Sequence, residues 1–245
     1  MMASFSRSDK AWPKYRWVVF DAVGTLIQPN PSVSVAYHAI AARHGSRLTV
    51  SQISERFRRA FRESESKRFL DDQPDCTRWQ SNNAIEIARW RWIVNEVVTD
   101  VGDGERCFTE LWDHFAHPAS WSCFDDVKET LSALADAGYR MAIASNFDSR
   151  LHAVCDENSA LRPIEHRFVS SETGFRKPAP EFYSAVISHC GSPAREILMV
   201  GDDPEHDVAG PKTAGMQAVL LDRRATNAHD NSIESLHQLV AGLRD

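Results

Sequence analysis

The stretch WVVFDAVGTL, residues 17–26, decides the fold of this chain. Four apolar residues end in Asp21, and a small turn containing Gly24 follows at once. An apolar run of this kind predicts a parallel strand that is buried on both faces. In an open α/β sheet, ligands bind outside the carboxyl ends of the strands, which is where Asp21 would lie. Asp21 is therefore a candidate site residue, although a lone acid after a strand more often only caps the next turn.

Three later stretches favour the functional interpretation of Asp21. Residues 142–146 (AIASN) and residues 199–203 (MVGDD, with Asp207 beyond) are again apolar strands that end in polar residues. Between them, residues 176–178 (RKP) place a lysine before the Pro-rich start of a helix. Each of these stretches alone is a weak signal, but the four in this order are a strong one.

In this order, the four stretches resemble the four motifs of the haloacid dehalogenase superfamily, whose hydrolases use an aspartate nucleophile. The resemblance covers almost the whole chain. Residues 115–118 through 145–151 are similar to one subgroup, the haloacid dehalogenase-like hydrolase domain-containing protein 3 type. That subgroup also lacks the second acid of the first motif, and the position of that acid is Val23 here.

The order of predicted elements gives the fold class. From residue 119 onward, strands and helices alternate, which predicts a Rossmann-like, doubly wound parallel sheet. Residues 28–32 (QPNPS) predict a break, and residues 30–118 carry helical patterns without a convincing strand. The resemblance implies that this segment is an inserted helical cap domain. We therefore expect a catalytic core at 14–29 and 119–245 and a cap at 30–118, with Ile233 opening a last amphipathic helix.

Composition limits the partners and the compartment. The net charge of -6 and the pI near 5.9 argue against a nucleic-acid or anionic-membrane surface. No run reaches the roughly 18 apolar residues of a membrane span, and residues 1–16 lack the apolar core of a signal peptide. Five widely spaced cysteines without a Cys-x-x-Cys pair favour buried thiols and a cytoplasmic protein. No pattern indicates the oligomeric state.

The resemblance assigns a role to each motif residue. Asp21 would attack phosphorus and form an aspartyl-phosphate, which divides one difficult displacement into two easier ones. This chemistry concentrates negative charge and calls for a hard cation with oxygen ligands, so Mg²⁺ is the implied cofactor. Its implied ligands are the Asp21 carboxylate, the Val23 backbone carbonyl and Asp202. The carbonyl ligand does not depend on the side chain at position 23.

The remaining motif residues would bind the phosphoryl group or support the metal. Lys177 would neutralise the phosphoryl oxygens as their charge spreads in the transition state. Phosphoryl contacts are also implied for Thr25, Ser145 and Asn146. Asp203 and Asp207 would support the metal or hold the lysine, and capping of the turn before Pro204 is a competing role for Asp203.

Val23 leaves three explanations open, because valine cannot transfer the proton that a positioned acid would supply. The substrate can have a leaving group that needs little protonation, such as an acyl phosphate or an activated phosphonate. A cap residue or a water molecule can supply the proton, with His38 and His206 as candidates. Alternatively, the protein binds phosphorylated ligands with little turnover.

Three functions therefore compete. The first is a phosphatase-type hydrolase that acts on a small phosphorylated metabolite, and the second is a weakly active or non-catalytic binder of phosphoryl ligands. The third is a 2-haloacid dehalogenase, because residues 20–26 closely resemble the first motif of those enzymes. Dehalogenases need no metal and lack the acidic fourth motif, so residues 201–203 and Asp207 favour phosphoryl chemistry.

Overall fold

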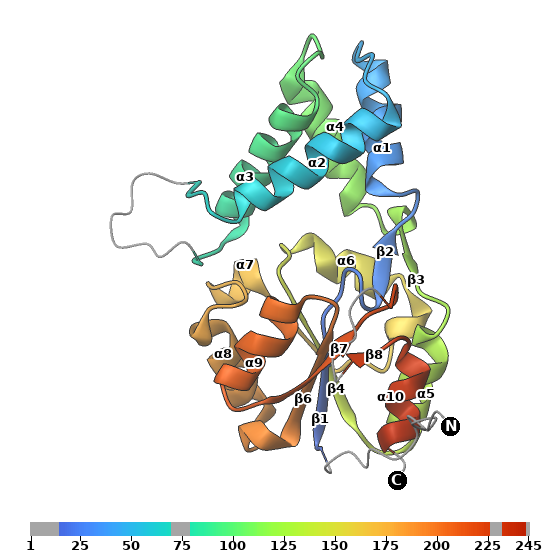
Figure 1. The fold of residues 1–245 in the computed structure, drawn as a ribbon, viewed down its shortest axis with the longest axis vertical. Coiled ribbons are helices and arrows are strands. Elements are labelled where there is room, and N and C mark those ends of the chain that lie inside the picture. Colours follow the sequence, from blue (N-terminus) through green and yellow to red (C-terminus); the bar gives the residue numbers. More distant parts are fainter. Residues whose placement is uncertain (1–14, 70–78, 226–231, 244–245) are drawn as a thin grey trace, which may run out of the picture.

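The computed structural model describes residues 15–69, 79–225 and 232–243. Within these residues, parallel strands form one sheet in the order β5-β4-β1-β6-β7-β8, in the lower part of Figure 1. The strands are β1 (Trp17–Phe20), β4 (Arg140–Ser145), β5 (His166–Val169), β6 (Ile197–Gly201), β7 (Gln217–Leu221) and β8 (Ser232–Ile233). The doubly wound α/β fold that the sequence predicts is confirmed.

Strand β1 lies inside the sheet, between β4 and β6, and helices cover both of its faces. Val18 and Phe20 join a hydrophobic cluster with residues of α5 (Val127–Asp136) and α10 (Leu236–Leu243). Trp17 and Val19 join a second cluster, with residues of α8 (Pro180–Cys190). In Figure 1, α8 lies to the left of the sheet, and α5 and α10 lie to its right. The uninterrupted apolar run of β1 is what this two-sided burial requires.

The other helices of the sheet region lie between its strands in sequence. They are α6 (Arg150–Asp156), α7 (Ser170–Thr173) and α9 (Gly210–Thr213), and a π-helical segment, η4 (Pro204–Ala209), follows β6. Segment η4 begins at Pro204, with Asp203 as its N-cap, shortly after β6 ends at Gly201. It therefore brings Asp207 back to the edge of the sheet where Asp21 and Asp202 lie.

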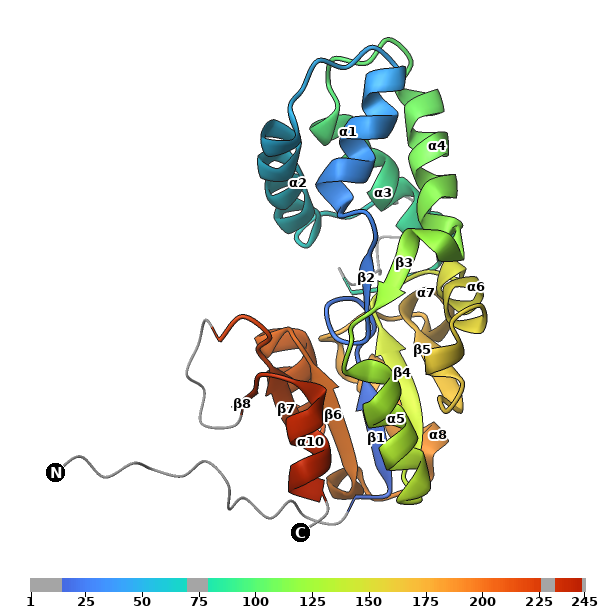
Figure 2. The same cartoon turned by 90° about the vertical axis from the view of Figure 1, so that its right-hand side faces the viewer.

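Four helices form a separate layer above the sheet (Figures 1 and 2). They are α1 (Val33–Arg43), α2 (Val50–Ser64), α3 (Asn83–Val97) and α4 (Gly104–Ala116). Side chains at their N-termini cap three of them: Thr49 with Gln52 forms a capping box, and Asn82 and Asp103 accept backbone N–H groups. These helices bury a hydrophobic cluster of their own, so they have the core that a domain needs. We take them to be the cap, and the exact division of the chain at residues 30 and 118 stays a prediction.

Several contacts join the cap to the sheet region, and two of them are backbone pairings. Strand β2 (Ile27–Pro29) pairs antiparallel with β3 (Trp121–Cys123), where the chain leaves for the cap and returns from it (Figure 2). A second contact is an antiparallel bridge between Gln80 and Phe175. The sequence predicts neither strand of the β2–β3 ribbon, because each strand has only three residues and β2 includes Pro29. Such short segments show no readable alternation of apolar and polar residues.

The end of the described chain also differs from its prediction. Ile233 belongs to strand β8 and pairs with Leu221, so the last helix begins only at Leu236. The apolar spacing that suggests one helix therefore combines a two-residue strand with the helix that follows. No helix among the described residues is long and apolar enough to cross a membrane.

Candidate active site

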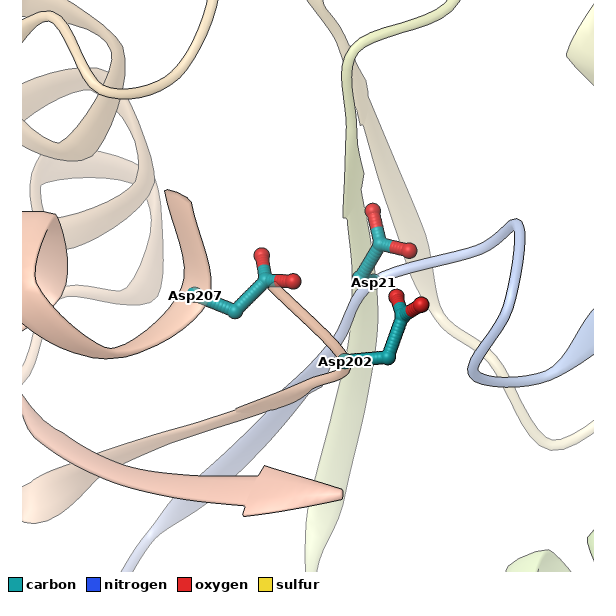
Figure 3. Close-up of side chains that lie close together, drawn as sticks. All are labelled: Asp21, Asp202 and Asp207. Atoms are coloured by element: carbon teal, nitrogen blue, oxygen red, sulfur yellow. The ribbon is translucent and has the colours of Figure 1, made fainter. Parts of the chain in front are cut away.

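Three aspartates converge at the carboxyl edge of the sheet. Asp21 follows β1, Asp202 follows β6, and Asp207 lies in η4. One carboxylate oxygen from each lies within 4.8 Å of the other two. Figure 3 shows the Asp21 and Asp202 carboxylates side by side, with that of Asp207 directed toward them. Two motifs that are about 180 residues apart in the sequence thus form one acidic cluster, because β1 and β6 are neighbouring parallel strands.

Lys177 lies inside this cluster as its buried cation. Its Nζ donates to Asp21 Oδ1 at 2.8 Å, to Asp207 Oδ1 at 2.7 Å and to the Ala144 carbonyl at 2.8 Å. The side chain is almost fully buried, with 1% of the residue exposed. All three protons of the ammonium group therefore have partners, and its position is fixed between two of the three carboxylates.

Asn146 holds the backbone of Lys177 in place. Its Nδ2 donates to the Lys177 carbonyl at 2.9 Å, and its Oδ1 accepts the Lys177 N–H at 2.7 Å. The amide side chain therefore binds the lysine loop, and the phosphoryl contact expected for Asn146 stays a prediction. In this structure, Asn146 is a positioning residue for Lys177.

The acidic cluster carries more negative charge than Lys177 balances. Burial raises the pKa of Asp21 to about 7: the nearby Lys177 opposes this shift, and Asp207 and Asp202 add to it. Desolvation of its carboxylate and the charge of Asp207 likewise raise the pKa of Asp202 to about 6. Desolvation is the largest cause of both pKa shifts, the neighbouring carboxylates add to it, and Lys177 opposes it.

Two glycines allow the carboxylates to approach the backbone. Gly24 has a φ of +95°, and a Cβ on it would lie 2.4 Å from Asp202 Oδ2. A Cβ on Gly201 would lie 2.2 Å from the Asp207 carboxylate. A side chain at either position would therefore displace a carboxylate of the cluster.

The residues present fit a hard divalent cation. The donors are carboxylate oxygens, which Mg²⁺ prefers, and their charge exceeds that of the buried lysine. Asp21 and Asp202 would hold the ion. Asp207 has one oxygen on Lys177 and the other on the Asp203 N–H at 3.1 Å, so it serves to orient the lysine. The ligand role of the Val23 carbonyl stays a prediction.

The other predicted residues lie around this cluster. Thr25 is fully buried, and its Oγ1 is 3.5 Å from Asp202 Oδ1, a long contact. Ser145 ends β4 and lines the cavity above the cluster. Asp203 caps η4, because its Oδ1 accepts the N–H groups of Glu205 and His206 at 2.8 Å each. Its carboxylate is thus used in the turn that precedes Asp207.

Neither proton-donor candidate is bonded to Asp21. His206 lines the cavity, and its Nδ1 lies 3.5 Å from Asp203 Oδ2. His38 is not among the described residues that line the cavity. Val23 lines it together with Asp21, so an apolar side chain stands beside the expected nucleophile.

A cavity of about 480 Å³ extends from the cluster to the cap. Nine of the residues that line it are aromatic, and the sequence did not predict that they share one wall. The helical patterns show which residues are apolar, but they do not show which of them face the sheet. The aromatic residues of the wall are Tyr37, Phe57, Phe61, Trp90, Phe108, Trp112, Phe115, Trp121 and Phe147.

Comparisons with known proteins agree with this geometry. Residues 15–215 match the family model described as haloacid dehalogenase-like hydrolase. The chain is 26% identical over 240 residues to "Haloacid dehalogenase-like hydrolase domain-containing protein 3" of Danio rerio, which covers 94% of this chain and 96% of the relative. It is 33% identical over 139 residues to "Ribulose-1,5-bisphosphate 5-phosphatase" of Halopiger xanaduensis, which covers 51% of this chain and 58% of that protein.

Solved structures share the fold. The putative hydrolase YfnB of Bacillus subtilis, described as bound to magnesium, superposes with a TM-score of 0.73 at 19% identity, covering 95% of this chain and 100% of that one. L-2-haloacid dehalogenase of Xanthobacter autotrophicus superposes with a TM-score of 0.72 at 18% identity, covering 94% and 98%. Identities this low establish the fold alone. With the family match over most of its length, the chain belongs to the haloacid dehalogenase-like hydrolases.

Proposed function

We propose that this hydrolase cleaves a small phosphorylated metabolite by Mg²⁺-dependent phosphoryl transfer to Asp21. The observation that carries this proposal is the set of three carboxylates within 4.8 Å of one another, balanced by one buried lysine. A carbon-directed nucleophile needs no such excess of negative charge. Phosphoryl chemistry uses it, because a divalent cation held there neutralises phosphoryl oxygens.

Each group of the chain then has a defined task. The Asp21 carboxylate attacks phosphorus and displaces the organic group through its bridging oxygen, and water later cleaves the aspartyl-phosphate to release phosphate and restore Asp21. Lys177 is fixed by Asp207 and the Ala144 carbonyl, so its ammonium is oriented before the substrate arrives. Bound Mg²⁺ supplies Lewis-acid stabilisation of the phosphoryl oxygens, with Asp21 and Asp202 as its side-chain ligands. Ser145 stands at the strand end and is the remaining candidate for a hydrogen bond to the phosphoryl group.

Two relatives support phosphoryl transfer by their names. One is the Halopiger ribulose bisphosphate phosphatase, and the other is "Phosphoserine phosphatase" of Thermus thermophilus, 22% identical over 222 residues. The second candidate function, a binder with little turnover, is favoured by Val23 alone. The expected cytoplasmic location and the absence of nucleic-acid or membrane partners stay predictions.

The dehalogenase alternative rests on the shared fold and on the first motif. Asp202 and Asp207 argue against it, because a halide leaving a carbon centre would meet two further negative charges near the nucleophile. Halide release is therefore measured alongside phosphate release in the test.

The test measures the two products in parallel. The protein with Mg²⁺ is incubated with phosphate esters, acyl phosphates and phosphonates, and phosphate release is recorded. A short 2-haloacid is incubated separately, and halide release is recorded. Asp21→Asn, which keeps the size of the side chain, is the matched control.

We expect phosphate release that EDTA and Asp21→Asn both abolish, and no halide above a blank. Metal-independent halide release that Asp21→Asn removes would replace the proposal with the dehalogenase reading. Binding of phosphorylated ligands without any release of phosphate would leave the second candidate function, a binder with little turnover.

A further inference from the structure

We propose that the substrate is a phosphate ester with an aromatic, largely apolar organic part, which the cap cavity holds above Asp21. This inference rests on the proposed function and adds the substrate class to it. Its basis is the cavity wall, the state of the charged side chains in that wall and one buried hydroxyl group.

The aromatic side chains form a continuous series from the cap to the sheet edge. Neighbouring ring centroids are 5.8 Å apart for Phe61 and Phe57, 5.4 Å for Phe57 and Tyr37, and 6.1 Å for Tyr37 and Phe115. The series continues at 6.1 Å to Trp121 and at 5.6 Å to Phe147, the residue after Asn146. These separations are typical of packed aromatic pairs, so the wall offers ring faces and edges along its length.

Two arginines of the wall, Arg89 in the cap and Arg150 at the start of α6, are already paired within the protein. Arg89 is 3% exposed; its Nε donates to Ser64 at 3.0 Å, and its guanidinium contacts Glu65 and Glu86. Arg150 forms two hydrogen bonds of 2.7 Å with Asp148 and lies over the Trp112 ring. These groups hold the wall together and offer little to a ligand.

Tyr37 contributes a hydroxyl group to the described wall. The residue is 1% exposed and lines the cavity. Burial also raises the pKa of Tyr37, so the group stays a proton donor. An acceptor atom on a ligand could therefore receive a hydrogen bond from this hydroxyl group.

The cavity therefore does not suit a polyhydroxylated or zwitterionic substrate. A sugar hydroxyl or an amino-acid charge placed against the aromatic part of this wall would lose water without gaining a partner there. Arg62, the other cation of the wall, is exposed and remains in contact with water. A volume of about 480 Å³ is sufficient for a fused-ring organic group with its phosphoryl group at the metal site.

The experiment compares two non-hydrolysable phosphonates by calorimetric titration with wild-type protein and Mg²⁺. Naphthylmethylphosphonate carries the proposed organic part, and 2-hydroxyethylphosphonate carries a polar one. Trp90→Ala removes a ring that stacks on Phe57 within the wall, at 6.4 Å between centroids. Trp92→Ala is the matched control, because Trp92 lies on the same helix but contacts Phe69 and Lys67 outside the cavity.

We expect naphthylmethylphosphonate to bind at least about tenfold more tightly than the polar phosphonate. Trp90→Ala should weaken its binding about three- to tenfold, and Trp92→Ala should leave the binding constant unchanged. Equal binding of the two phosphonates, or an equal loss in both tryptophan variants, would overturn the inference.

The same data separate this inference from the proposed function. Tight naphthylmethylphosphonate binding without phosphate release from any ester would support the substrate class while the hydrolytic proposal failed. Phosphate release from polar esters without an aromatic preference in binding would retain the hydrolase and overturn the aromatic substrate class.

Discussion

At the scale of single residues, position 23 determines how protons can move in the site. Val23 lines the cavity beside Asp21, at the position of the second acid that the resemblance to the superfamily implies for its phosphatases. Without that acid, an alkoxide leaving group must depart without a proton from position 23, and water must attack the aspartyl-phosphate without a base there. Leaving groups that are stable as anions are affected least.

The first prediction restores the acid. Val23→Asp should raise turnover of alkyl phosphates more than that of aryl phosphates, by up to about 10²–10⁴-fold where the geometry is ideal. Val23→Asn is the control, because it adds polarity at similar size without a transferable proton. An alkyl-to-aryl rate ratio that is unchanged in folded, Mg²⁺-binding Val23→Asp would mean that another group already transfers the proton.

The second prediction concerns the buried cation. Lys177→Met should destabilise the metal-free protein by about 3–5 kcal/mol, because Asp21 and Asp207 lose their partner. The double variant Lys177→Met/Asp207→Asn should recover part of this loss, since one uncompensated carboxylate is removed. Urea unfolding at neutral pH measures both. A single variant as stable as the wild type would show that Lys177 is not the counter-charge of the cluster.

Residue identity was the most predictable part of the site. The strand-end acids and Lys177 stand out in the sequence because their order matches a known set of motifs. The partners that fix them were less predictable. Asn146 holds the Lys177 backbone, and Asp203 caps η4. Neither role can be recognised in the sequence, where each residue is only a polar side chain after a strand.

At the scale of elements, one ion pair ties three segments to the nucleophile turn. Arg223, after β7, binds both oxygens of Asp126 at 2.9 Å and donates to the Thr25 carbonyl at 2.8 Å. Asp126 also accepts the N–H of Leu236 at the start of α10, at 2.8 Å. The sequence predicts Asp125 or Asp126 as a helix cap only, because the partners are about 100 residues distant.

The third prediction is a pH dependence of this brace. Burial acts to raise the pKa of Asp126, but its hydrogen bonds with Arg223 and Leu236 outweigh burial, and the net pKa is lowered. A carboxylate with a lowered folded-state pKa stabilises the protein above its unfolded pKa of about 3.9, and this contribution is lost as the pH falls through the folded value.

Asp126→Asn should therefore cost about 1–3 kcal/mol at pH 7. The difference from the wild type should shrink only below about pH 4. Urea unfolding across that range measures it, with Asp125→Asn, an exposed neighbour, as the control. A cost for Asp126→Asn that stays constant through the acid range would contradict the role of its charge.

At the scale of the whole molecule, the cap supplies the chamber and the sheet supplies the charges. The alternation of strands and helices was readable, because periodicity reports burial. The cavity was not, since Trp90 and Trp92 look alike in the sequence and only the docking of the cap places the first in the wall. The short β2–β3 ribbon that sets this docking has too few residues to show a pattern.

The fourth prediction follows from the charge of the assembled site. Mg²⁺ should stabilise the folded protein by about 2.7 kcal/mol at a concentration 100 times its Kd, because the unfolded chain has no such cluster. Asp202→Asn should remove this stabilisation, and Glu205→Gln, an exposed acid in η4, should not. A melting temperature that does not respond to Mg²⁺, even with a phosphate mimic present, would argue against the metal site.

The central claim, that Asp21 is the nucleophile toward phosphorus, is tested most directly by the mass of the peptide that carries it. Because Val23 cannot activate water, the aspartyl-phosphate should persist long enough for rapid acid quenching and mass spectrometry. With Mg²⁺ and an aryl or acyl phosphate, we predict the mass of one phosphoryl group on Asp21. This label should be absent with EDTA and in Asp21→Asn, and less abundant in Val23→Asp. Phosphate release from wild-type protein with Asp21 unlabelled at every quench time, or a label on another residue, would contradict the claim.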